Sequence, residues 1–325
     1  MEEKDKKLIK TSQQKPIIEY LNDFLDWLDI EKGLSFKTQE NYARFLKKFF
    51  EWLKLEKLEN LKPAELSPEH IFKYKVFLSR GKKTLKKTTQ ACYLIALRQF
   101  LTFFAEKDIL SLPPEKIKLP KETEKKIHFL NLDQVKKLLE APNTSDIVGL
   151  RDRAILEVLF STGMRVGELV KLTKDQIKIE PQTKDLEITI IGKGERPRTV
   201  YFSERAIFWL REYLKTRQDK ERALFISYRG KTPGAPITIR SVERMIKKYA
   251  TLAGLPPNTV CHTLRHSFAT DLLQKGVDVR LVQEFLGHKS IVTTQIYTHI
   301  TKPQLKKIHQ KYHGFREEKE NPHQS

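Results

Sequence analysis

Residues 262–297 read HTLRHSFATDLLQKGVDVRLVQEFLGHKSIVTTQIY, the stretch of this chain with the most helix signals and reactive side chains. The pattern predicts three short helices separated by tight turns. Thr263 is expected to cap the first helix, and Gly276 suits its C-terminal end. The second helix is expected to end at Gly287, and the third to begin after Ser290.

The starts and ends of these helices carry two imidazoles, a guanidinium and a phenol: His262, His288, Arg265 and Tyr297. Because the turns are tight, we expect these four side chains to lie within reach of one another. A phenol that attacks a phosphodiester becomes a covalent phosphotyrosine. Arginine forks and imidazole donors stabilise the negative charge that develops on the non-bridging oxygens. The stretch therefore suits this reaction.

Two further candidate groups for this chemistry are found upstream. The sequence TGMRVGEL places Arg165 after a glycine turn and Glu168 three residues later, where its carboxylate can hold the guanidinium. In isolation such a pair is most often an ordinary surface ion pair. The stretch DLEITIIGKGERPRTVYFS alternates apolar and polar residues around a glycine turn and predicts a β-hairpin with Lys193 at its tip. Lysines in hairpin turns commonly face solvent, and Lys184 and Arg196 are alternative candidates for a general acid.

The pattern H-x-L-R-H, then L-G-H, then a tyrosine nine residues further on, resembles that of the tyrosine recombinases, especially the Xer-type site-specific recombinases. The resemblance covers about residues 16–314. It implies a mainly α fold with a small β-sheet, made of an N-terminal four-helix, SAM-like core-binding domain and a mixed α/β catalytic domain. It also implies six catalytic residues, with Glu168 in support: Arg165, Lys193, His262, Arg265, His288 and Tyr297.

By this resemblance, Tyr297 attacks the scissile phosphate to give a 3′-phosphotyrosine and a free 5′ hydroxyl. The two arginines neutralise the phosphate, both histidines hydrogen-bond it, and His262 is the better candidate for taking the phenol proton. Lys193 protonates the leaving oxygen, and no metal or other cofactor is expected. The expected partner is double-stranded DNA with a specific inverted-repeat site. Four protomers on two such sites would pass through a Holliday junction.

Composition agrees with a nucleic-acid partner. Lys+Arg 61 against Asp+Glu 41 give a net charge of +20, which favours a polyanion. The alternative is a basic proteome without such a partner. The two cysteines, Cys92 and Cys261, predict no disulfide framework and fit a reducing cytoplasm. No apolar run of transmembrane length and no signal peptide are apparent, so we expect a soluble cytoplasmic protein without a membrane partner.

The N-terminal part predicts four amphipathic helices, over residues 16–32, 36–53, 68–78 and 88–106. No acidic residue occurs between Glu69 and Glu106, and the turn before the fourth helix carries four candidate DNA-binding lysines: Lys82, Lys83, Lys86 and Lys87. A solvated loop is the alternative for such a charge run. Arg240 and Arg244, on a helix predicted over 239–252, are further DNA-binding candidates. A short strand is predicted over 223–227.

The predicted division of the chain is a flexible N-terminus over 1–14, a helical DNA-binding domain over 15–108, a linker over 109–127, a catalytic domain over 128–314 and a polar tail over 315–325. The linker prediction follows from three prolines and many charges without a helical period. A final helix within 303–314 packs either within the protomer or on a neighbouring one.

Several alternatives remain open from the sequence. His262 and His266 have a spacing that also suits zinc, but Thr263 stands where the H-E-x-x-H motif has glutamate. A type IB topoisomerase shares the tyrosine chemistry, and a DNA-binding protein without activity shares the fold. Among recombinases, a resolvase of chromosome or plasmid dimers competes with a mobile-element integrase, and the absence of room for an arm-binding domain favours the resolvase. A paralogous recombinase and a cell-division translocase are candidate further partners.

Overall fold

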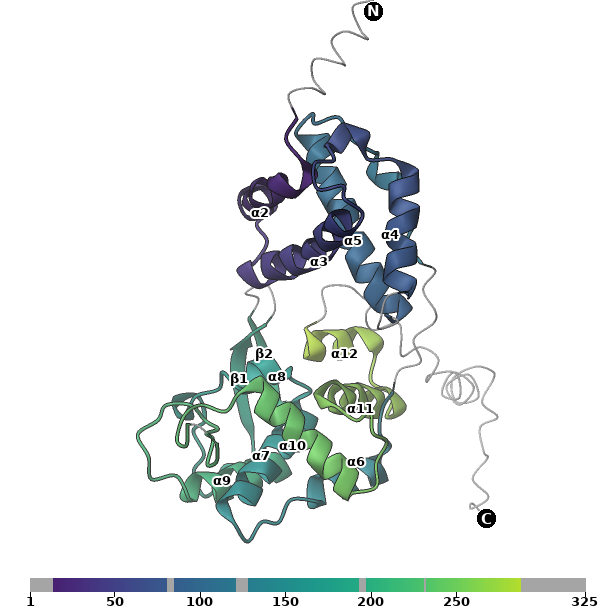
Figure 1. Ribbon diagram of the computed structural model, residues 1–325. Helices are drawn as coiled ribbons and strands as arrows, with labels where there is room; N and C mark the ends of the chain where they lie inside the picture. Colours follow the sequence, from purple (N-terminus) through teal and green to yellow (C-terminus); the bar gives the residue numbers. More distant parts are fainter. Residues whose placement is uncertain (1–13, 81–84, 121–127, 193–196, 231, 288–325) are drawn as a thin grey trace, which may run out of the picture. The chain divides into compact units, whose positions relative to one another are not determined.

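The computed structural model describes residues 14–80, 85–120, 128–192, 197–230 and 232–287. The chain divides into two compact units, Met1–Glu124 and Lys125–Ser325 (Figure 1). Each unit has a hydrophobic core of its own. The described elements are mainly helices with one two-stranded sheet, as predicted.

The first unit is a helical bundle. Its main helices, preceded by a 3₁₀ turn over Ile17–Tyr20, are α2 (Leu21–Ile30), α3 (Phe36–Leu55), α4 (Pro68–Arg80) and α5 (Lys87–Glu106). Helix α5 packs against the other three helices. Its ring of Phe100 lies 5.1 Å from that of Phe24 and 4.6 Å from that of Phe104, centroid to centroid. The four predicted helices are therefore confirmed, and their aromatic faces form the core.

The stretch predicted as a linker begins as part of the first unit. Leu112 is 8% exposed and Ile117 is fully buried, and both belong to the core of the first unit. The guanidinium of Arg98 on α5 donates a hydrogen bond to the carbonyl of Ile117. The predicted start of the linker at residue 109 is therefore too early, because apolar side chains among the prolines pack on the bundle.

The second unit surrounds one buried helix. Its elements are α6 (Leu132–Glu140), α7 (Ile147–Thr162), α8 (Val166–Leu169), β1 (Leu186–Ile191), β2 (Pro197–Phe202), α9 (Glu204–Lys215), α10 (Ile239–Leu252), α11 (Cys261–Gln274) and α12 (Val279–Leu286). Helix α7 is in contact with α6, α8, α9, α11 and β2. It is buried around most of its circumference, as expected of a helix covered on all sides.

Burial of α7 extends to its charged residues, which are paired. Arg153 and Arg205 both donate to the carboxylate of Glu157, through Nε at 2.9 and 2.6 Å. The carboxylate of Asp152 accepts hydrogen bonds from the Arg151 guanidinium and from the Tyr249 hydroxyl, the latter at 2.9 Å. These contacts fix α7 against α9 and α10.

The predicted hairpin is confirmed. Strands β1 and β2 are antiparallel, with Ile188 opposite Val200 and Ile190 opposite Arg198. Ile188, Ile190, Val200 and Phe202 are buried on one face. Lys193, predicted at the tip of the hairpin, lies outside the described residues.

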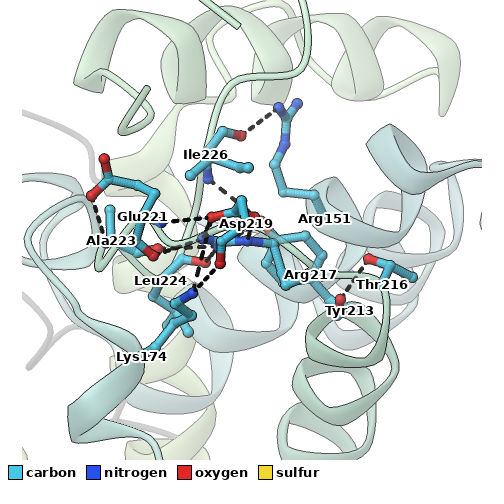
Figure 2. A network of polar contacts seen from close by, with 10 residues as sticks. All are labelled: Arg151, Lys174, Tyr213, Thr216, Arg217, Asp219, Glu221, Ala223, Leu224 and Ile226. Carbon is cyan, nitrogen blue, oxygen red and sulfur yellow. Dashed lines mark hydrogen bonds and ion pairs between the residues drawn. The ribbon is translucent and has the colours of Figure 1, made fainter. Parts of the chain in front are cut away.

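The strand predicted over 223–227 is wrong. This segment forms only isolated bridges, between Ala223 and Thr173 and between Ile226 and Pro236. Its shape is set instead by Arg217, whose side chain is 1% exposed and donates to the Asp219 carboxylate and to backbone carbonyls of the segment (Figure 2). Arg217 satisfies the carbonyls of Ala223 and Leu224, and the other backbone groups of the segment bond to separate residues on either side, so no continuous strand ladder forms.

Two local predictions concern the helices nearest the site. Helix α11 begins at Cys261 with Val260 as its N-cap, so the expected cap at Thr263 is wrong by three residues. The Thr263 hydroxyl instead accepts a hydrogen bond from the Val260 N–H at 3.1 Å. Helix α12 ends at Gly287, which has a φ of 61°, as predicted. No helix within the described ranges is long and apolar enough to cross a membrane.

Candidate active site and nucleic-acid interface

Arg165 lies in a turn that holds two helices together. Helix α7 ends at Gly163, whose φ of 60° favours glycine, and a Cβ on this residue would lie 2.4 Å from the Phe268 ring on α11. This close approach fixes the turn against α11. Arg165 follows as the N-cap of α8, and its side chain is 27% exposed.

Glu168 holds Arg165 at two points. The Arg165 backbone N–H donates to Glu168 Oε2 at 2.7 Å, and its Nη1 donates to Oε1 at 3.0 Å. The Glu168 side chain is itself 8% exposed. The contact expected between these two residues is therefore present, and it fixes the backbone of Arg165 as well as its guanidinium.

A second arginine, Arg198 on β2, pairs with the same carboxylate. Its Nη1 and Nη2 donate to the two oxygens of Glu168 at 2.9 and 2.7 Å. Burial acts to raise the pKa of Glu168, but hydrogen bonds from Arg198 and from the Arg165 backbone outweigh it and hold that pKa at about 2. Glu168 is therefore a carboxylate throughout the physiological pH range.

Sequence reasoning did not single out Arg198. A signal was nevertheless present, because the predicted alternation places Arg198 on the same face of the hairpin as Val200 and Phe202. An arginine at a core position of a strand needs a buried anionic partner. Only the fold identifies that partner as Glu168, thirty residues away.

Arg265 lies on α11 with 3% of its surface exposed. Its Nη1 donates to the Gly163 carbonyl at 2.6 Å and its Nη2 to the Leu286 carbonyl at 2.5 Å. One guanidinium thus joins the turn that leads into Arg165 to the end of α12. The residue that follows α12 and Gly287 is His288.

His262 stands in the first turn of α11, close to both arginines. Partial burial and the positive charges of Arg265 and Arg165 lower the pKa of His262. Its ring meets that of His266 edge to face, with centroids 5.2 Å apart. Burial and the charges of His262, Arg265 and His128 lower the pKa of His266 to about 4. Both rings are therefore mainly neutral near pH 7.

The structure thus brings together Arg165, Glu168, His262 and Arg265 from two predicted segments about a hundred residues apart. Three predicted catalytic residues, Lys193, His288 and Tyr297, lie outside the described residues. Within the described part of the chain, no group of three or more His, Cys, Asp or Glu side chains is arranged to hold a metal ion.

The candidate DNA-binding residues fall on two elements. Lys86 is the N-cap of α5 and Lys87 its first residue, both exposed, and this helix has no acidic residue in its first turn. Lys82 and Lys83 lie outside the described residues. Arg240 and Arg244 are exposed on α10.

The basic surface that the sequence predicts along α10 extends to the preceding loop, and sequence reasoning missed only that extension. A recess of about 320 Å³ is lined by Arg244 and Lys248 of α10 and by Arg229 of the preceding loop. The sequence signal was the spacing of Arg244 and Lys248, four residues apart on one side of a helix. Arg229 is added by the fold.

Comparisons with known proteins cover both units. The model of the phage integrase family matches residues 128–304, and that of the phage integrase N-terminal SAM-like domain matches residues 21–107. Tyrosine recombinase XerD of Listeria innocua is 35% identical over 301 residues, which cover 90% of this chain and 98% of that protein. Tyrosine recombinase XerD of Haemophilus ducreyi is 36% identical over 306 residues, 92% of this chain and 97% of that protein.

Solved structures give the same relationship. A structure of the XerH site-specific recombinase bound to a palindromic difH substrate, a post-cleavage complex, is 27% identical and has a TM-score of 0.68. It covers 85% of this chain and 80% of that one. A lambda integrase dimer bound to a COC′ core site shares the fold at 17% identity, with a TM-score of 0.66 over 90% of this chain and 79% of that one.

Both units match models of this family, and the relatives above are more than 30% identical along nearly their whole length. These findings identify the family of the chain. The chain belongs to the phage integrase family, as a Xer-like tyrosine recombinase that cuts and rejoins DNA.

Proposed function

We propose that Tyr297 is the nucleophile of this enzyme and that Arg165, Arg265, His262, His288 and Lys193 complete its active site. The observation that carries the proposal is the convergence of Arg165, Arg265 and His262 at one place. Arg265 also contacts the end of α12, from which the chain continues to His288 and Tyr297.

In the proposed reaction, the Tyr297 oxygen attacks the scissile phosphorus, and the bond from phosphorus to the 5′ oxygen breaks. The two guanidinium groups stabilise the charge that develops on the non-bridging oxygens. His262 accepts the phenol proton, since its lowered pKa keeps the ring neutral near pH 7. Lys193 donates a proton to the leaving 5′ oxygen, and His288 donates a hydrogen bond to the phosphate.

The product is a 3′-phosphotyrosine and a free 5′ hydroxyl. Attack by the 5′ hydroxyl of a partner duplex reverses the step and returns the proton to Tyr297. The phosphodiester energy is thereby retained in the intermediate. Two such exchanges on paired duplexes pass through a Holliday junction, which requires four protomers on two DNA sites.

We assign the DNA contacts to the exposed cations of α5 and α10. Lys86 and Lys87 stand at the N-terminus of α5, where backbone N–H groups also attract phosphate. Arg244, Lys248 and Arg229 line the basic recess beside α10. The logarithm of the DNA-binding constant falls linearly with the logarithm of the salt concentration, and each phosphate neutralised by one of these cations should make that slope steeper by about one.

We further propose that the biological reaction is resolution of chromosome or plasmid dimers at an inverted-repeat site in the cytoplasm. The similarity to proteins named XerD along 98% of their length supports this role over that of a mobile-element integrase. A cell-division translocase or a paralogous recombinase is then the expected partner. A plasmid dimer with two copies of the site should be converted to monomers in cells that express the chain and not in cells that lack it.

A nicked suicide substrate tests the chemistry. The nick next to the scissile phosphate lets a short fragment diffuse away after attack, so the covalent intermediate accumulates. We expect a denaturant-resistant adduct with wild-type protein and none with Tyr297→Phe. Tyr201→Phe is the matched control, since Tyr201 is an exposed tyrosine on β2 and should leave adduct formation unchanged. An undiminished adduct with Tyr297→Phe would refute the proposed nucleophile.

A further inference from the structure

Arg198 lies beside the site but is almost completely buried. Its side chain is 9% exposed, against 27% for that of Arg165. Both of its terminal nitrogens are engaged with the two oxygens of Glu168. Because both bonds go to one carboxylate, the charge of Arg198 is already paired and its fork is not available to a phosphate. Arg265 is as deeply buried, but its two terminal nitrogens donate to neutral carbonyls, which do not neutralise its positive charge. Arg165 donates to Glu168 through only one terminal nitrogen and is more exposed, so its guanidinium can contact a phosphate.

The Glu168 carboxylate connects the two arginines. One of its oxygens accepts from Arg198 and from Arg165 Nη1, and the other accepts from Arg198 and from the Arg165 backbone N–H. Charge-assisted, bidentate bonds of this kind fix direction as well as distance. If Arg198 were absent, Glu168 could rotate about its side-chain bonds and Arg165 would lose the fixed anchor for both its backbone and its guanidinium.

Arg198 also contacts the chain that leads to His288. A Cβ added to Gly287 would lie 2.8 Å from Arg198 Cδ, so the end of α12 packs directly on this side chain. Residues Tyr201 of β2 and Phe285 of α12 meet edge to face at 6.0 Å between ring centroids and hold the same two elements together. Arg198 thus lies between the Arg165 turn and the start of the segment that carries His288 and Tyr297.

We propose that Arg198 is a positioning residue for DNA cleavage, which acts through Glu168 to hold Arg165 in the orientation that meets the scissile phosphate. This proposal rests on the proposed catalytic role of Arg165. The hairpin would then have a second role besides supplying Lys193, because Arg198 of β2 orients Arg165, which belongs to another segment.

The chain contains a second buried carboxylate with two arginines, remote from the site, although its Arg205 side chain is 44% exposed and makes a single bond. Glu157 on α7 is a buried carboxylate that also accepts from two arginines, Arg153 and Arg205. Neither of these arginines contacts Arg165 or Arg265 through any hydrogen bond found in the described residues. Arg205→Gln therefore removes an arginine from a buried carboxylate while leaving the site intact, as Arg198→Gln removes one beside it.

The test is a double-mutant cycle on single-turnover cleavage of the nicked suicide substrate. Wild type, R198Q, R165Q and R165Q/R198Q are compared at saturating protein, so that site affinity and cleavage rate are measured separately. We expect R198Q to bind with unchanged affinity and to cleave about 10- to 100-fold more slowly, the usual cost of a small misplacement of a reacting group. The double variant should cleave no more slowly than R165Q alone, because Arg198 acts only through Arg165.

Two further variants separate positioning from folding. R205Q should cleave at the wild-type rate. R198K should recover part of the loss, since an ammonium reaches one carboxylate oxygen but cannot form the fork. Should R198Q melt below the assay temperature, the cycle run with R198K decides the question.

Three results would overturn the proposal: wild-type cleavage by R198Q, a loss that multiplies with that of R165Q, or a loss wholly accounted for by weaker binding. A wild-type chain that forms no adduct would be a different failure, since it refutes the proposed function itself and this inference with it.

Discussion

Replacing Glu168 by glutamine should destabilise the second unit in a pH-dependent way. The side chain is 8% exposed, and its pKa falls from an ordinary value of 4.5 to about 2 in the folded protein. Because the folded-state pKa lies below the unfolded one, the unfolded chain binds the proton more tightly between these values. The stabilisation is therefore fully present above about pH 4.5 and is lost as the pH falls toward 2.

The fall in pKa corresponds to about 3 kcal/mol of unfolding free energy. Glu168→Gln keeps the shape but removes the charge, and it leaves the Arg198 guanidinium buried beside a neutral amide. We expect the variant to be about 3 kcal/mol less stable than wild type at pH 7, and the difference to shrink steadily below pH 4.5.

The assay is urea unfolding followed by tryptophan emission. The chain has three tryptophans, Trp27, Trp52 and Trp209. With Trp27 and Trp52 replaced by phenylalanine in both proteins, Trp209 reports on the second unit alone. Glu187→Gln, at an exposed position of β1, is the control and should change stability by less than about 0.5 kcal/mol. A Glu168→Gln deficit that is small at pH 7, or that does not change between pH 7 and 3, would refute the reasoning.

Three other predictions follow from the same geometry. Arg165→Gln should raise the pKa of His262 toward its ordinary value, because one of the charges that lower it is removed; an NMR titration of the His262 ring measures this. Gly287→Ala should lower the unfolding free energy of the second unit by about 2 kcal/mol, because the residue has a φ of 61° and the new Cβ would clash with the Arg198 side chain. Gly276→Ala, also at positive φ but in open space, should lower it by only about 1 kcal/mol. Urea unfolding measures both values, and equal losses would contradict the packing of Gly287 on Arg198. Arg217→Met should cost about 3 kcal/mol in the same assay, since it leaves several loop carbonyls and a carboxylate without their donor (Figure 2), and a neutral effect would show that the loop is held by other contacts.

Features with a local cause were predictable from the sequence. Helix α9 begins after Ser203, whose hydroxyl accepts from the Ala206 N–H, and α7 ends at Gly163 in the left-handed conformation. Both signals act over three or four residues and are visible in the sequence. The order of the hairpin and helices around the H-x-L-R-H segment was predictable for the same reason.

Features with a distant cause were not predictable. Arg198 has a place in the site only because β2 passes Glu168, and Arg265 finds its acceptors at Gly163 and Leu286, 102 and 21 residues away. The segment 223–227 has a strand-like composition, yet two of its carbonyls accept from Arg217 and its remaining backbone bonds go to separate residues on either side. Pattern reasoning finds the residue types in such cases, and packing decides their partners.

The same distinction explains the two displaced boundaries. Thr263 is a good cap by type, but α11 begins at Cys261, which is buried, and the Thr263 hydroxyl accepts from the Val260 N–H instead. Leu112 and Ile117 stand among prolines and charges that suggest a linker, and they are nevertheless buried in the first core. In both cases burial of a few apolar atoms outweighed a local signal.

The central claim is that the phenol of Tyr297 attacks a phosphate held by Arg165 and Arg265. The most direct measurement is mass spectrometry of the adduct trapped on a nicked suicide substrate, after digestion with a protease and a nuclease. The account predicts a nucleotide remnant on the peptide that contains Tyr297, at the phenolic oxygen, and its disappearance in Arg165→Gln and Arg265→Gln. A remnant attached to any other side chain, or one formed at the wild-type rate without both arginines, would contradict it.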